Sequence, residues 1–102
     1  MNREQAIAAL RDYEPELKAL GVVSASLFGS VARDDAGIDS DVDVVVKLSE
    51  SFSAGGFDYF WRFQQLENRL SVLLGCQVHV VAEPVRKERF QTKIDRGRAL
   101  AF

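Results

Sequence analysis

With 102 residues, the chain has room for one small domain and hardly more, so we expect a single domain over residues 1–102. Hydrophobic residues make up 47% of the chain and charged residues 27%, a balance that favours a packed globular protein and argues against a disordered one. The formal net charge of -2 excludes an overall basic surface, which argues against nucleic acid as a partner.

The chain has one cysteine, Cys76, and one histidine, His79. A single cysteine excludes an internal disulfide and a Cys-based zinc cluster, and a single histidine excludes a paired-His metal site. No apolar run approaches the ~18 residues that a membrane span needs, and the N-terminus lacks the apolar stretch of a signal peptide. We therefore expect a cytoplasmic protein with no membrane contact.

Two helices and a strand are predicted at the start of the chain. Apolar residues at helical spacing predict a helix over residues 3–13, and a proline near the start and a glycine at the end delimit a second helix over 15–20. Apolar residues alternate with serines in residues 22–28, which predicts the first strand. The apolar residues of this alternation are Val23, Ala25 and Leu27.

The middle of the chain contains a turn, a strand and a loop. Gly29 ends the first strand, and residues 30–35 are expected to open a short helix with Ser30 near its N-cap. Residues 40–48 predict a second strand, and the small and polar residues of 49–56 predict a flexible loop.

The C-terminal half shows the clearest helix, over residues 57–74, which Gly75 ends. Its apolar stripe is Tyr59, Phe63, Leu66, Leu70 and Leu73. Residues 77–83 predict a third strand, and 86–100 a basic helix that breaks near Gly97. The order of elements predicts an α+β fold in which helices cover a small mixed sheet.

Asp41 and Asp43 stand at the start of the apolar second strand, where aspartate is unusual. Residues two apart in a strand point to the same face, so the two carboxylates lie side by side and repel. A bound Mg²⁺ ion removes this repulsion, and the ligands that it prefers are carboxylate oxygens together with substrate phosphates. The pair therefore predicts a Mg²⁺ site that works with a polyphosphate, although Asp-x-Asp alone more often marks a solvated strand end.

Gly29, Ser30 and Arg33 supply groups that suit the phosphates. Glycine allows a ligand to approach the backbone, and the helix that follows offers free N–H groups at its positive end. Ser30 adds a hydroxyl donor, and Arg33 can reach a phosphate oxygen. Each residue alone is more often part of a turn or a surface charge, but the order and spacing with Asp41 and Asp43 favour a nucleotide site.

The stretch "LFGSVARDDAGIDSDVDVVV", residues 27–46, resembles the signature of the minimal nucleotidyltransferases of the DNA polymerase β superfamily, and the likeness extends over the whole chain. The resemblance implies the polymerase β-like nucleotidyltransferase fold and transfer of AMP from ATP to a hydroxyl. It places the triphosphate on Gly29 and Ser30, and Mg²⁺ on Asp41 and Asp43. It also implies a helical HEPN toxin as partner, with this chain as the antitoxin.

One position departs from the family pattern. The third carboxylate of the family stands in the third strand, where this chain has His79. Imidazole is a poor ligand for Mg²⁺, yet neutral histidine can act as a general base near pH 7. His79 is therefore either a catalytic base or the mark of a weakened site that still binds nucleotide.

Three aromatic residues, Phe57, Phe60 and Trp61, lie partly off the apolar stripe of the long helix. We expect them to widen the cover of the core, and the alternative is an exposed patch for a partner or for a homodimer. The basic C-terminal residues are expected to form a solvated helix face. Three functions stay open: an adenylyltransferase acting on a protein, an inactive antitoxin that neutralises by contact, and a small-molecule transferase.

Overall fold

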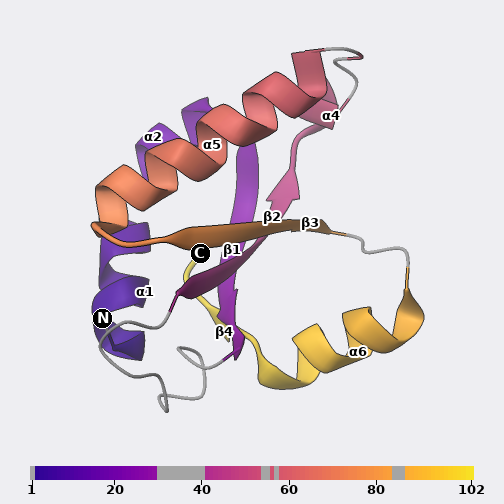
Figure 1. Cartoon of the computed structure of the whole chain (residues 1–102). Coiled ribbons are helices and arrows are strands. Elements are labelled where there is room, and N and C mark those ends of the chain that lie inside the picture. Colours follow the sequence, from indigo (N-terminus) through magenta and orange to yellow (C-terminus); the bar gives the residue numbers. More distant parts are fainter. Residues whose placement is uncertain (1, 30–40, 54–55, 57, 84–86) are drawn as a thin grey trace.

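A four-stranded mixed sheet forms the centre of the computed structural model, which describes residues 2–29, 41–53, 56, 58–83 and 87–102 (Figure 1). The strands are β1 (Val22–Phe28), β2 (Val42–Leu48), β3 (Val78–Glu83) and β4 (Ala99–Leu100). Their order across the sheet is β3-β2-β1-β4, with β2 and β3 parallel and the other pairs antiparallel. The predicted α+β class with a small mixed sheet is confirmed.

Except for α4, the helices of the described residues agree with the sequence patterns. They are α1 (Arg3–Asp12), α2 (Glu14–Ala19), α4 (Glu50–Ser53), α5 (Asp58–Leu74) and α6 (Glu88–Gly97). The capping box of α1 begins at Asn2, whose side chain accepts a hydrogen bond from the backbone N–H of Gln5 at 2.8 Å. No helix in this described part of the chain is long and apolar enough to cross a membrane. The helix expected over residues 30–35 lies outside the described residues.

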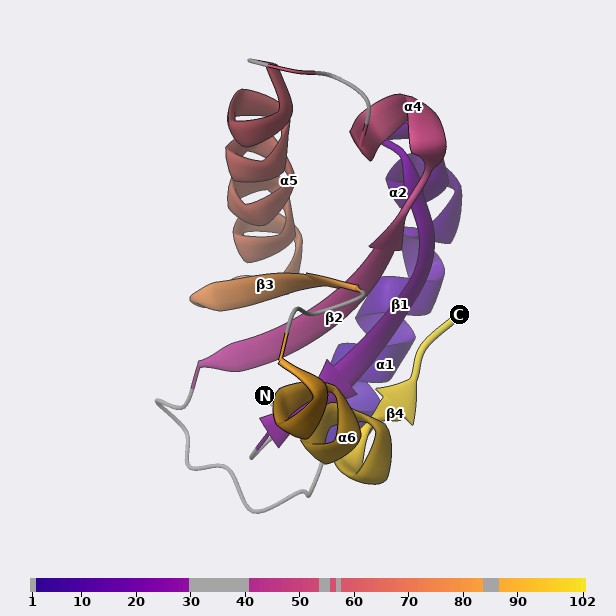
Figure 2. The ribbon, with the colours of Figure 1, turned by 90° about the vertical axis from the view of Figure 1, so that its right-hand side faces the viewer.

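One face of the sheet is covered by α1, α2 and α5 (Figure 2). Strand side chains alternate between faces, so every second residue points into this core. Its members from the strands include Ala25, Leu27, Val42, Val44, Val46, Val78 and Val80. From the helices come Ala6, Leu10, Leu17, Leu66, Leu70 and Leu74. Burying each large apolar side chain contributes roughly 1.5–3 kcal/mol, so this face carries most of the stability.

The strand residues between those of the core point to the opposite face of the sheet, and α6 lies on that side. Phe90 of α6 packs edge-on against Phe28 of β1, with ring centroids 6.1 Å apart. Arg98, just after α6, forms an ion pair with Glu83 of β3 at 2.6 Å. Asp43 is on this face because its neighbours Val42 and Val44 belong to the core.

Two expectations about the N-terminal half and the loop are wrong. Val23, expected to alternate with Ala25 on the apolar side of β1, is 49% exposed because the β1–β2 register shifts between Val22 and Ser24. Part of the loop expected over 49–56 is the helix α4. Ser49 Oγ accepts a hydrogen bond from the N–H of Phe52 at 3.3 Å, which is the bond of a helix N-cap.

The C-terminal element differs as well. The basic helix ends at Gly97, as expected, but the next residues form β4 instead of continuing as a loose helix. Ala99 and Leu100 pair with Leu27 and Ser26 of β1, and Arg11 of α1 donates to the carbonyl of Ala101 at 2.8 Å. These bonds close the edge of β1 and hold the end of α6 beside the open face of the sheet.

Candidate functional site

Gly29 and Asp43 lie in direct contact where β1 ends beside the start of β2. Phe28 and Asp43 are paired in the β1–β2 register, and Gly29 follows with φ of 74°. A Cβ atom on Gly29 would lie 2.6 Å from Oδ2 of Asp43, so the carboxylate sits against the bare backbone. Only glycine suits this position, because it tolerates both the left-handed conformation and the close approach.

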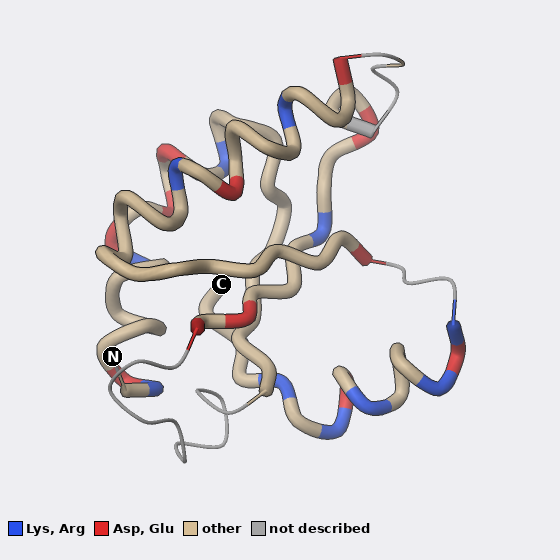
Figure 3. The backbone as a smooth tube through the Cα atoms, viewed as in Figure 1, with Lys and Arg blue, Asp and Glu red and all other residues tan. Residues whose placement is uncertain are grey.

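Asp41 and His79 complete the polar cluster on the same face. His79 of β3 is the register partner of Asp43, and its Nε2 lies 2.8 Å from Oδ2 of Asp41. Both partners of this bond are about half exposed, at 52% for His79 and 48% for Asp41. Figure 3 shows acidic positions at the start of β2 and basic positions spaced along α6. The structure therefore brings together the three residues that the sequence nominated as catalytic.

The local charges shift two pKa values in this cluster. Burial raises the pKa of the Asp43 carboxyl, the neighbouring His79 lowers it, and Asp41 raises it further. The hydrogen bond to Asp41 raises the pKa of His79, desolvation opposes this, and the charges of Asp41, Asp43 and Glu67 add to it. His79 therefore keeps its proton to a higher pH than a free histidine, and Asp43 holds its negative charge at a cost.

The donor set fits one hard divalent cation. Asp41 and Asp43 offer carboxylate oxygens on one open face, which suits Mg²⁺ when substrate phosphates complete its coordination. No group of three or more His, Cys, Asp or Glu side chains within the described residues is arranged to hold a metal ion. His79 offers only a nitrogen, and that nitrogen already contacts Asp41. The described residues thus fit one metal ion bound together with a substrate, and among them there is no donor set for a second.

Two of the predicted nucleotide-binding residues, Ser30 and Arg33, lie outside the described residues. Two residues that the sequence did not nominate lie beside the described part of the candidate site. Phe90 and Lys93 of α6 line a cavity of about 310 Å³ together with Gly29 and Asp43. The basic C-terminal segment was expected to form a solvated helix face, and Lys93 is exposed as expected. Phe90 and Lys93 are three residues apart and share one face of α6, but this spacing alone does not indicate that a cavity lies beside them.

The aromatic residues at the start of α5 form a separate surface. Phe60 is 79% exposed and Trp61 is 66% exposed, so the expectation that they cover the core is wrong for both. Phe57 lies outside the described residues. The predicted alternative, an exposed aromatic patch, is the one that the structure supports.

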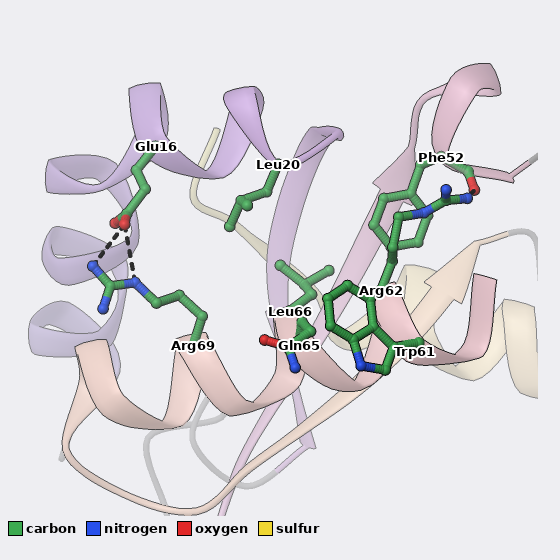
Figure 4. Close-up of a pocket in the computed structure, with 8 residues that line it drawn as sticks. All are labelled: Glu16, Leu20, Phe52, Trp61, Arg62, Gln65, Leu66 and Arg69. Carbon is green, nitrogen blue, oxygen red and sulfur yellow. Dashed lines mark hydrogen bonds and ion pairs between the residues drawn. The ribbon is translucent and has the colours of Figure 1, made fainter. Parts of the chain in front are cut away.

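A second hollow, of about 380 Å³, opens beside this patch between α2, α4 and α5 (Figure 4). The guanidinium of Arg62 lies over the ring of Phe52, 5.3 Å from its centroid, and donates to the carbonyl of the same residue. Arg69 binds Glu16 through two hydrogen bonds of 2.9 and 2.6 Å. Phe52 follows the end of β2, roughly 20 Å along the strand from Asp41, so this hollow is distinct from the carboxylate site.

A mixed sheet with a glycine turn packed on an Asp-x-Asp strand is the arrangement of a nucleotidyltransferase. The model of the nucleotidyltransferase domain family matches residues 10–99, and the chain belongs to this family as a minimal nucleotidyltransferase. Nucleotidyltransferases in general use a divalent metal ion and a nucleoside triphosphate. The predicted family and fold are confirmed.

Individual relatives agree with this assignment. The chain is 35% identical over 79 residues to the protein adenylyltransferase MntA of Thermococcus cleftensis, across 76% of this chain and 74% of that protein. A solved minimal nucleotidyltransferase superposes with a TM-score of 0.73 at 32% identity, covering 97% of this chain and 95% of the other. A toxin–antitoxin complex with AMP-PNP superposes with a TM-score of 0.64 at 22% identity, covering 100% of this chain and 73% of the other. At this identity the similarity supports the fold alone.

Proposed function

We propose that the chain is a cytoplasmic, Mg²⁺-dependent adenylyltransferase that moves AMP from ATP to a hydroxyl on a partner protein and thereby acts as an antitoxin. The observation that carries this proposal is the carboxylate of Asp43 packed on the bare backbone of Gly29, with Asp41 on the same open face. The similarity to a protein adenylyltransferase supports ATP as the donor and a protein as the acceptor.

Each site residue has a separate role in this proposal. Asp41 and Asp43 would hold the Mg²⁺, which would offset part of the negative charge of the triphosphate and of the two carboxylates. Gly29 lets the phosphates approach the backbone. In the segment that follows, Ser30 and Arg33 are the proposed hydrogen-bond donors to the phosphate oxygens. In this proposal the single domain over residues 1–102 binds ATP, the donor of the AMP group.

The transfer itself is a displacement at the α-phosphorus of ATP. The acceptor hydroxyl oxygen forms a bond to that phosphorus, the bond from it to the bridging oxygen breaks, and pyrophosphate leaves with the bonding electrons. The hydroxyl proton passes to His79 in its neutral form, which stands beside Asp43 in the sheet register. His79 must first release the proton that its bond to Asp41 stabilises, so this step favours a pH above the usual range of histidine.

A protein partner explains the exposed aromatic patch of Phe60 and Trp61, since two large rings in water are unusual for a surface without a binding role. We propose a helical, HEPN-like toxin as that partner, and a homodimer as the other use of the same patch. The solved toxin–antitoxin complexes with this fold motivate the first choice.

One observation favours a second function, an antitoxin that binds nucleotide and neutralises its toxin by contact without catalysis. The nitrogen of His79 pairs with Asp41 at 2.8 Å, where the family has a third carboxylate, and this bond competes with a metal ion for Asp41. The two functions predict different chemistry but the same partner.

Label transfer from α-labelled ATP to the partner separates the two functions. If His79 is the base, the wild type transfers label and His79→Ala is much slower. If the site is weakened by the missing acid, His79→Asp transfers more label than the wild type. Asp12→Asn removes an exposed carboxylate at the end of α1 and serves as the control. No transfer by any variant, with toxin neutralisation intact, would leave only the binding function.

A further inference from the structure

The cavity beside Asp43 has two walls of different origin. The sheet contributes Phe28, Gly29 and Asp43, and α6 contributes Phe90 and Lys93. At about 310 Å³ it is at the small end of the range of roughly 300–1,000 Å³ for ligand pockets, so it fits part of a nucleotide and not the whole. Its position places that part next to the carboxylate of Asp43.

Phe90 gives this cavity an aromatic wall. Its ring meets Phe28 at an interplanar angle of 79°, an edge-to-face contact that fixes the ring without stacking on it. The side chain is still 38% exposed, although the ring packs on the sheet. A planar base can therefore stack on Phe90, and stacking of a base on an aromatic side chain is favourable for every base.

Lys93 gives the same cavity a cation. It makes no ion pair or hydrogen bond with any of the described residues, whereas the neighbouring Arg98 is paired with Glu83 and Asp95. Lys93 is three residues from Phe90, so both side chains are on one face of α6 and one ligand can contact both. An ammonium group that lines the same cavity as Asp43 suits a phosphate that Asp43 alone would repel.

We propose that Phe90 and Lys93 bind the nucleoside triphosphate of this enzyme, with the base stacked on Phe90 and a phosphate paired with Lys93. The inference rests on the proposed function, because it assumes that the triphosphate binds at Gly29 and Asp43. It makes α6 part of the active site and explains why α6 is held on the open face by β4 and by the Arg98–Glu83 ion pair.

Calorimetry in Mg²⁺ with two probes tests the two contacts separately. ATP carries a base, and inorganic tripolyphosphate does not. Phe90→Leu keeps the apolar packing on Phe28 and removes the stacking face, so it should weaken ATP binding about tenfold and leave tripolyphosphate unchanged. Phe90→Trp keeps an aromatic face and should retain ATP binding, even if smaller side chains at this position prevent folding.

Lys93→Gln should weaken both probes about fivefold or more, because it removes a phosphate contact. Two matched controls should change neither affinity. Tyr13→Leu alters a ring between α1 and α2 that is exposed to the same 38% as Phe90. Arg89→Gln removes a cation of α6 that lines a neighbouring hollow, which Lys93 also lines, but does not line this cavity.

Two different results would overturn the α6 subsite and the proposed function. A wild-type protein that binds ATP and tripolyphosphate equally, with no effect of Phe90→Leu or Lys93→Gln, overturns the α6 subsite and leaves the metal–phosphate site in place. A wild-type protein that binds neither probe in Mg²⁺ overturns the proposed function, and the subsite with it.

Discussion

Gly29→Ala is the substitution that most sharply tests the contact between β1 and Asp43. The new side chain meets two separate costs. The backbone at Gly29 has φ of 74°, and an L-residue in the left-handed region costs roughly 1–2 kcal/mol. The added Cβ would also lie 2.6 Å from Oδ2 of Asp43, where ordinary contact starts at about 3.5 Å, so the carboxylate must move by roughly an ångström.

The movement of Asp43 carries its own cost. Rotating a side chain about 30° away from its preferred rotamer costs of order 0.5–1.5 kcal/mol, which brings the expected loss for Gly29→Ala to about 2–3 kcal/mol. Gly75→Ala is the matched control, because Gly75 has φ of 69° and nothing lies within 4 Å of its Cβ position. It should lose only the backbone part, about 1–2 kcal/mol.

Urea unfolding and calorimetry measure both consequences. The free energy of unfolding should fall by about 1 kcal/mol more for Gly29→Ala than for Gly75→Ala. Displacement of Asp43 should weaken Mg²⁺-dependent ATP binding by about 10–100-fold in Gly29→Ala alone, as is usual when the support of a metal ligand is lost. Equal destabilisation of the two variants, with normal ATP binding by Gly29→Ala, would show that the Asp43 carboxylate does not depend on the bare backbone at Gly29.

Further predictions concern the charges of Asp43 and His79 and the proposed hydrogen bond from Ser30 to a phosphate. The raised pKa of Asp43 means that the folded state loses stability as pH rises through that pKa, so Asp43→Asn should melt at a higher temperature than the wild type at pH 7 without metal, in a calorimetric scan. The pKa of His79 is raised in the folded state, so protonated His79 stabilises the fold fully below about pH 6.5 and loses this effect as pH rises through the folded-state pKa. The melting temperatures of the wild type and His79→Gln should therefore converge above that pKa in a pH series. Ser30→Ala should weaken ATP binding by on the order of 1 kcal/mol in a titration, and a sharp fall in melting temperature with unchanged affinity would make Ser30 structural only.

The fold was predictable because its main elements carry strong periodic signals. The α5 stripe and the valines of β2 each repeat over enough residues to fix both the element and its buried face. β4 has two residues, too few to show alternation, and its existence depends on pairing with β1. α4 depends on one cap at Ser49 and one buried ring at Phe52, which the polar composition of the segment conceals.

The candidate site was predictable where its residues are close in sequence or follow a family pattern. Asp41, Asp43 and Gly29 belong to one short stretch, and His79 stands at the family's third acidic position. Phe90 and Lys93 reach the site from the other end of the chain, so only the packing of α6 on the open face reveals them. The bond between His79 and Asp41 is likewise a result of the β2–β3 register, which sequence alone does not give.

The most direct test of the account is the affinity of the purified chain for ATP in Mg²⁺ and in EDTA, measured by calorimetry for the wild type, Asp43→Asn and Asp12→Asn. If Asp41 and Asp43 bind a cation together with the triphosphate, the wild type and Asp12→Asn should bind ATP more tightly in Mg²⁺, and Asp43→Asn should lose that difference. Equal affinity with and without the metal ion in all three proteins would contradict the claim that this face is a metal–nucleotide site.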